Sequence, residues 1–327
     1  MSQLDTARQT EAFIDHLLDS LAGAFEVYTI HIGDQLGFYE TLADEGALTP
    51  RDLATHTETH ERYVREWLEQ QTVAGILAVE NERANASERR YSLPSEYVEP
   101  LTEESSLNFL APLAQLFVGA ASPIDRVVEA FSTGKGVPFA AFGHDLHEGQ
   151  GRMNRSVFSQ LLGEEWLPAV PDVHERLQHE SARVADIGCG YGYSAIAIAK
   201  RYPGVRVDGY DLDEASVAAA NEHVAEAGLE DRVTIHHRDA GDPVIEGEYD
   251  LVTAFECVHD LSDPVGVLEA MRRLAGDDGI VVVMDERVGD SFAETGDLDW
   301  MMYGWSVLHC LPVGMADQPS AATGTVM

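Results

Sequence analysis

Three glycines stand close together between an apolar run and an alanine-rich run. Gly188, Gly190 and Gly192 follow "RVADI" and precede "SAIAIAKRY", and Asp211 comes about twenty residues later, at the end of a second apolar run. Glycine tolerates positive φ and lets a ligand lie against the backbone where a helix begins. A carboxylate at the end of the second strand can accept hydrogen bonds from both hydroxyls of a ribose. This pattern predicts a site for a ligand that carries adenosine.

The spacing of the glycines helps to choose between such ligands. Dinucleotide-binding folds use G-x-G-x-x-G, whereas here Tyr193 holds the fifth position after Gly188 and the third glycine comes one place early. NAD, bound by an oxidoreductase, is therefore the weaker interpretation.

The arrangement D-x-G-x-G-x-G, which begins at Asp186, resembles motif I of class I S-adenosylmethionine-dependent methyltransferases. The resemblance continues through Asp211, through Asp239 with Ala240, and through "YDLVTAFECVHDLSDP". It implies S-adenosylmethionine as cofactor, a Rossmann-like doubly wound α/β sheet, and a cofactor site formed by Asp186, Gly188, Gly190, Gly192, Asp211, Leu212, Asp239, Ala240 and Phe255.

The whole chain is similar to two-domain O-methyltransferases that act on small molecules. In plant-like members an "HDWSD" segment supplies the general base, and this chain has His259-Asp260-Leu261-Ser262-Asp263. The resemblance implies that His259 is the catalytic base, and we predict that Asp260 or Glu286 orients it. With its ordinary pKa near 6.5, a histidine there could be neutral at physiological pH. The alternative is that His259 has a packing or capping role.

The elements that must position these residues alternate regularly from Ala182 onward. Strand-like and helix-like runs follow one another, which predicts a parallel sheet covered on both faces with its ligand at the carboxyl ends of the strands. We therefore expect a methyltransferase domain at 181–327. Sheets of this class end with two further strands, and the residues after Val288 contain no apolar run for either. The sequence thus predicts a chain that lacks the last two strands.

A different organisation is expected before this domain. Apolar residues with helical spacing fill 4–30, Thr49 and Pro50 mark the start of another helix, and "GILAVE" and "RRYSLP" suggest a two-stranded wing. We predict a winged-helix domain at 1–100, and a helical linker and substrate lid at 101–180. Residues 1–100 hold 19 acidic and 7 basic residues. This balance disfavours DNA and favours a role in homodimer formation.

The charge of the chain is unusual. Its 57 acidic and 21 basic residues give a net charge of −36, and Lys135 and Lys200 are its two lysines. Concentrated salt would screen such repulsion, so a halophilic archaeon is the predicted source. The alternative is an acidic protein from an ordinary cell. The charge also disfavours nucleic acid as a partner, and the lack of long apolar runs predicts a cytoplasmic protein without a membrane segment.

Two further features bear on the site. His144 and His147 are three residues apart, but no second ligand pair follows at a suitable spacing, so no metal site is predicted. An aromatic and methionine-rich helix, from Trp300 to Leu308, is expected to be buried or to line an apolar acceptor pocket. The predicted function is methyl transfer to a small molecule. Two alternatives stay open: a winged-helix regulator that senses S-adenosylmethionine, and an NAD-linked oxidoreductase.

Overall fold

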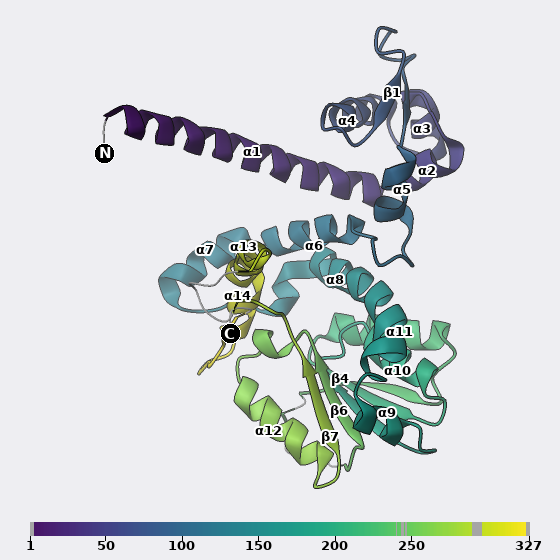
Figure 1. The fold of residues 1–327 in the computed structure, drawn as a ribbon, viewed down its shortest axis with the longest axis vertical. Helices are drawn as coiled ribbons and strands as arrows, with labels where there is room; N and C mark the ends of the chain where they lie inside the picture. Colours follow the sequence, from purple (N-terminus) through teal and green to yellow (C-terminus); the bar gives the residue numbers. More distant parts are fainter. Residues whose placement is uncertain (1–2, 240, 243–244, 246, 290–295, 325–327) are drawn as a thin grey trace. The chain divides into compact units, whose positions relative to one another are not determined.

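A computed structural model describes residues 3–239, 241–242, 245, 247–289 and 296–324 (Figure 1). The chain divides into two compact units, residues 1–118 and 119–327. The boundary between the units falls within one helix, whereas the sequence predicts domain boundaries at 100/101 and 180/181.

The first unit begins with a long helix and continues as a small helical domain with a hairpin. Its elements are α1 (Gln3–Gln35), α2 (Phe38–Glu45), α3 (Pro50–His56), α4 (Glu61–Val73), β1 (Ala78–Glu80), β2 (Arg90–Ser92), α5 (Ser95–Thr102) and most of α6 (Ala111–Ala121). The two strands pair antiparallel with Val79 opposite Tyr91. This arrangement matches the predicted winged helix.

Local sequence explains how these helices begin and pack. The Thr49 hydroxyl caps α3 by accepting a hydrogen bond from the backbone N–H of Asp52, and Pro50 occupies the first turn. The core of this unit is built on Trp67, whose ring lies edge-on to Phe38 and Tyr39 with centroids 4.8 and 5.3 Å away. Buried aromatic contacts therefore hold α2 against α4.

The second unit starts with helices and then builds a sheet. The helical part comprises α7 (Ile124–Thr133), η1 (Phe139–Phe142), α8 (Gly143–Val157), the π-helical segment η2 (Phe158–Trp166) and α9 (Pro171–Leu177). The part that follows comprises β3 (Arg183–Ile187), α10 (Tyr193–Arg201), β4 (Arg206–Asp211), α11 (Glu214–Glu226), β5 (Val233–His237), β6 (Leu251–Phe255), η3 (Val258–Asp260), α12 (Pro264–Ala275), β7 (Ile280–Met284), α13 (Asp299–Trp305), η4 (Ser306–Cys310) and α14 (Leu311–Gly314).

Within the described residues the sheet has five strands in the order β5-β4-β3-β6-β7, all parallel. Apolar side chains from both faces of the strands are buried: one face packs on α9, α10 and α11, and the other on α12 (Figure 1). The two sides therefore exclude water from the backbone ladder, as the near-continuous apolar runs of the strands predicted. After β7 the described tail is helical and adds no strand to the sheet.

None of the helices in the described part of the chain is long and apolar enough to cross a membrane.

Candidate active site at the carboxyl edge of the sheet

The loop between β3 and α10 has the backbone conformation that its glycines predicted. Gly188, Gly190 and Gly192 all have positive φ, at 64°, 51° and 79°. A Cβ on Gly188 would lie 2.8 Å from the sulfur of Cys257, and one on Gly192 would lie 3.1 Å from Cβ of Ala220. A side chain at either position would therefore meet both backbone strain and a steric clash. The loop leads into the N-terminus of α10 at Gly192, and Gly188 and Gly190 contribute backbone to the cavity wall.

Asp211 ends β4 directly beside this loop. One carboxylate oxygen accepts a hydrogen bond from the backbone N–H of Gly190 at 2.8 Å, and the other accepts one from the N–H of Asp213 at 2.9 Å. Burial raises the pKa of Asp211, and these two hydrogen bonds oppose the rise. The carboxylate thus holds the glycine loop in place at the position where a ribose was expected.

Asp186 lies beneath the loop and is almost completely buried. Its carboxylate accepts hydrogen bonds from the hydroxyls of Ser194, at 2.5 Å, and Thr253, at 2.7 Å. Burial raises its pKa to about 6, and the two hydroxyls oppose the rise. These bonds join β3 to α10 and β6. Asp186 therefore supports the loop from below, although it also reaches the wall of the cavity.

The other predicted cofactor residues lie around the same edge, with one exception. Leu212 is 61% exposed, Asp239 follows β5 and accepts a hydrogen bond from the N–H of Gly241, and Phe255 is buried at the end of β6. Ala240 lies outside the described residues. The topology thus brings the described members of the predicted set to the carboxyl ends of β3, β4, β5 and β6.

A cavity of about 720 Å³ opens at this edge, inside the second unit. This volume is within the range of sites for small molecules and cofactors. One part of its wall is the glycine loop with Asp211, Leu212 and Asp239, and another is formed by Glu256, Cys257 and Asp260 after β6. The wall is completed by α8 residues and by Val313 and 316–319.

The aromatic segment of the tail does not line this cavity, which corrects one expectation. Trp300 is 76% exposed, and the tail contributes Val313, Ala316 and Pro319 to the wall. The reason is that the chain passes through α13 and η4 before it returns to the cavity at α14. The apolar pattern predicted a helix correctly, but the cavity contacts come from the turn that follows it.

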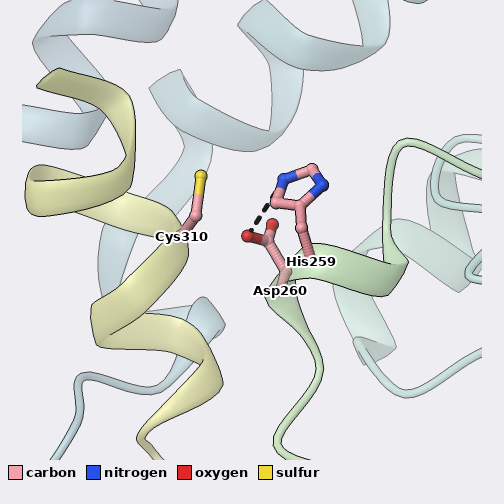
Figure 2. Close-up of side chains that lie close together, drawn as sticks. All are labelled: His259, Asp260 and Cys310. Carbon is pink, nitrogen blue, oxygen red and sulfur yellow. Dashed lines mark ion pairs between the residues drawn. The ribbon is translucent and has the colours of Figure 1, made fainter. Parts of the chain in front are cut away.

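The predicted catalytic residue, His259, lies in η3 just after β6, and its side chain is almost fully buried among carboxylates. Its Nδ1 forms a short contact with a carboxylate oxygen of Asp285, whose other oxygen accepts the backbone N–H of His259 at 3.2 Å. Its Nε2 lies 3.2 Å from Oδ1 of Asp260 (Figure 2). The sequence predicts Asp260 or Glu286 as the orienting group. Asp260 does contact His259, but the hydrogen-bonding partner of Nδ1 is Asp285 rather than Glu286.

The environment also overturns the expectation that His259 has an ordinary pKa. Burial by itself would lower the pKa of this imidazole, but hydrogen bonds with Asp285 and Cys310 and the charge of Asp260 outweigh burial and raise the pKa to about 11. The carboxylates around the ring therefore favour the protonated imidazole. The sequence could not reveal this shift because Asp285 and Cys310 are distant from His259 along the chain.

Two other side chains at the cavity were not singled out as site residues from the sequence. Glu256 has a positive φ of 54° and is buried near Glu286 and Asp285; burial and these neighbouring charges raise its pKa to about 7. His147 stacks on Phe139 with ring centroids 4.3 Å apart. Its spacing with His144 was considered for a metal, but in the structure it belongs to the cavity wall.

Comparisons with known proteins bear directly on this geometry. Residues 185–281 match the family described as a methyltransferase domain, and residues 24–103 match the Rv2258c-like winged HTH domain. The first match runs from within β3 to the start of β7, which includes the glycine loop and η3. Residues 185–281 form a methyltransferase domain.

Individual relatives match over the same part of the chain. A polyketide synthase, ThaQ of Burkholderia thailandensis, is 38% identical over 104 residues, which are 32% of this chain and 5% of ThaQ. The ubiquinone biosynthesis O-methyltransferase of Marinobacter nauticus is 35% identical over 100 residues, or 30% of this chain and 41% of that enzyme. The chain thus spans less than half the length of these curated relatives.

The solved structure of human N-acetylserotonin methyltransferase in complex with SAM resembles this chain over 95% of its residues and 89% of that enzyme. The TM-score is 0.66 and the identity 18%, so this likeness concerns the fold. Together, the comparisons support S-adenosylmethionine as the methyl donor of the methyltransferase domain, and the predicted fold class is confirmed.

Proposed function

We propose that this protein transfers the methyl group of S-adenosylmethionine to a hydroxyl of a small molecule. The observation that supports this most is the meeting of the glycine loop, Asp211 and a carboxylate-rich wall around one cavity of about 720 Å³. The sulfonium methyl group is already activated, so the protein must chiefly align the acceptor with the S–CH₃ bond and exclude water. The acceptor oxygen forms its bond to the methyl carbon as the carbon–sulfur bond breaks, which leaves S-adenosylhomocysteine.

The methyl donor is proposed to lie along the strand ends. Asp211 would accept hydrogen bonds from the ribose hydroxyls, while Leu212 and Asp239 with Ala240 would flank adenine and Phe255 would contact the donor from the end of β6. The glycine loop would pass closely along it, since no side chain at Gly188, Gly190 or Gly192 blocks the approach. Asp186 would act through the loop that it supports.

The acceptor is proposed to lie on the side of the cavity formed by Glu256 and Asp260, with His259 assisting the loss of its proton. Asp285 and Asp260 favour the protonated form of this imidazole, and a protonated imidazole cannot accept a proton, so His259 acts as a base only after it has lost one.

Turnover on a panel of acceptors tests this function. The protein would be incubated with methyl-labelled S-adenosylmethionine and a set of phenols and polyketides, and both labelled product and S-adenosylhomocysteine would be measured. Formation of both, dependent on the acceptor, is expected. Binding of S-adenosylmethionine without turnover on any acceptor would favour the regulator instead, and tighter binding of NAD would favour the oxidoreductase.

We also propose that two copies of the chain associate through α1. Eight large apolar side chains of this helix are more than two-fifths exposed: Phe13, Ile14, Leu17, Leu18, Leu21, Phe25, Tyr28 and Ile32. An apolar stripe of this length is unusual on a monomer, and the same stripe on a second copy would cover it in a two-fold interface. The winged-helix unit would then serve association rather than DNA binding.

Two charges in the stripe should therefore separate the copies. We expect the wild-type protein to sediment as a dimer, and the double variant Leu17→Glu/Leu21→Glu to sediment as a monomer with unchanged far-ultraviolet circular dichroism, because each copy would bury two carboxylates in the interface. The matched control is Ala12→Glu/Gly23→Glu, which adds the same charge on the opposite face of α1. A monomeric wild type, or a control that dissociates as readily, would contradict the proposal.

The acidic surface leads to a separate prediction about salt. We propose that the protein is adapted to high salt, and expect its unfolding midpoint to rise by about 5 °C or more between 0.1 and 1 M KCl, as the Debye length falls from about 10 to about 3 Å. A variant with four exposed acids replaced by amides, Glu230→Gln/Asp231→Asn/Asp277→Asn/Asp278→Asn, should show a smaller rise. A midpoint that stays flat in the wild type would refute the adaptation.

A further inference from the structure

His259 belongs to a cluster of three side chains whose ligand atoms could hold a metal ion. His259 and Asp260 in η3 and Cys310 in η4 each offer one atom, and these atoms lie within 4.8 Å of one another. The two segments are fifty residues apart in sequence, and Figure 2 shows the three side chains turned toward the same small space. All three residues are buried or nearly so.

We propose that His259, Asp260 and Cys310 bind a single Zn²⁺ ion. An imidazole nitrogen, a carboxylate oxygen and a thiolate are all ligands of Zn²⁺, and the sulfur disfavours Mg²⁺ and Ca²⁺, which prefer oxygen ligands. Around a tetrahedral ion, with bonds of about 2.0–2.3 Å, neighbouring ligand atoms are roughly 3.3–3.6 Å apart. The 3.2 Å between His259 Nε2 and Asp260 Oδ1 is close to that spacing, and the sulfur of Cys310 lies within 4.8 Å of the other two ligand atoms.

Asp285 prepares His259 for this role. Its carboxylate accepts a hydrogen bond at Nδ1, which fixes the ring and directs Nε2 toward Asp260. A carboxylate that holds the far nitrogen of a metal-binding histidine is the usual arrangement around zinc, because it sets the tautomer and the ring orientation. Asp285 is thus a positioning residue, and the ligand atom of His259 is Nε2.

Two buried atoms in the same cluster have no hydrogen-bond partner among the described residues. One is Oδ1 of Asp260, and the other is Nε2 of His309, whose Nδ1 lies 3.8 Å from Oδ2 of Asp260. Buried polar atoms of this kind usually have a partner, and those that lack one often mark the place of a water or an ion. Oδ1 of Asp260 nevertheless lies 3.2 Å from Nε2 of His259 as an ion pair, which places both atoms where two ligands of one ion would lie.

A Zn²⁺ ion in this position would also affect methyl transfer, a role that rests on the proposed function. Asp260 also lines the cavity, so the ion would lie at the cavity wall. Three protein ligands leave a fourth tetrahedral position, which in catalytic zinc sites holds water or substrate. Binding displaces the protons of the Cys310 thiol and the His259 imidazolium. A hydroxyl on the fourth position would lose its proton more easily, so His259 would assist as a ligand rather than as a free base.

The metal itself can be measured without any methyl transfer. The protein, freed of metal with a chelator, would be titrated with Zn²⁺ against a chromophoric competitor, and with Co²⁺ as a spectroscopic probe. We expect one ion per chain and a near-ultraviolet thiolate-to-cobalt charge-transfer band. Cys310→Ser should weaken Zn²⁺ at least tenfold and abolish that band, and Asp285→Asn should weaken Zn²⁺ about 10- to 100-fold while the band remains.

Matched controls separate this site from adventitious binding. His236 contacts Asp208 at 3.1 Å much as His259 contacts Asp260, and Cys189 is another buried thiol. His236→Gln and Cys189→Ser should therefore leave the affinity for Zn²⁺ unchanged. If Cys310→Ser does not fold, Cys310→Ala and Asp260→Asn replace it, with folding checked by circular dichroism.

A wild type that binds less than one ion per chain, or a Cys310 variant that binds as the wild type does, would overturn the site. The proposed function fails separately, if Zn²⁺ binds but no acceptor is methylated. Undiminished turnover after complete removal of the metal would overturn the proposed role of the ion in the reaction.

Discussion

Asp211→Ala is expected to weaken S-adenosylmethionine at least tenfold in calorimetric titration. In the structure this carboxylate is the last side chain of β4 and holds the N–H groups of Gly190 and Asp213. Two ribose hydroxyls would add hydrogen bonds to a charged acceptor, and each such bond contributes roughly 1.5–3 kcal/mol. The substitution also releases the glycine loop, because the Gly190 N–H loses its acceptor. Both effects reduce the affinity for the donor.

Two further variants distinguish the loss of ribose contacts from general damage. Asp211→Asn keeps the shape and one acceptor oxygen, so its affinity should lie between those of the wild type and the alanine variant. Asp208→Asn changes an acid on the same strand whose partners are Arg183, His236 and Tyr249, and it should bind the donor normally. A folded Asp211→Ala protein that binds S-adenosylmethionine as tightly as the wild type would place the ribose elsewhere.

The part of the site that lies on the sheet could be predicted because its signals are local. Three glycines within five residues indicate the conformation of the loop. Because the strands are parallel, the acid at the end of the next strand must lie beside that loop. Gly188 and Asp211 therefore occupy the expected edge, and the observed positive φ angles are those that glycine favours. The same reasoning located η3 directly after β6. In each case, alternation of strands and helices makes the strands parallel, so residues that follow successive strands lie near one another at one edge of the sheet.

The surroundings of His259 could not be predicted in the same way. Asp285 reaches it from the end of β7, and Cys310 from a π-helical segment of the tail, so the contacts depend on how the tail folds back. The periodicity of apolar residues in the sequence does not indicate where the tail folds back. The aromatic run near Trp300 was more conspicuous in the sequence, yet the cavity wall comes from the residues after it. The charges and ligand atoms that distant segments bring to His259 can therefore be identified only from the structure.

His259→Ala is expected to lower kcat on a hydroxyl acceptor by about 10² or more, with little change in affinity for S-adenosylmethionine. The side chain lies just after β6, and its described contacts are with Asp260, Asp285 and Cys310. Its loss removes assistance to the departing proton and leaves the donor's hydrogen bonds in place. Stopped-time assays with saturating donor would give kcat, and titration calorimetry would give the affinity.

Acceptors of different acidity show whether the expected loss of kcat in His259→Ala comes from impaired removal of the acceptor's proton. An electron-poor phenol that is already ionised at the assay pH needs no help, so His259→Ala should retain most of the wild-type rate on it, while an ordinary phenol should react about 10²-fold more slowly than with the wild type. Substitution of a residue that only packs would slow both acceptors alike. An equal loss on both, or a loss of donor affinity in proportion to turnover, would therefore assign His259 a structural role and leave methyl transfer to alignment and proximity alone.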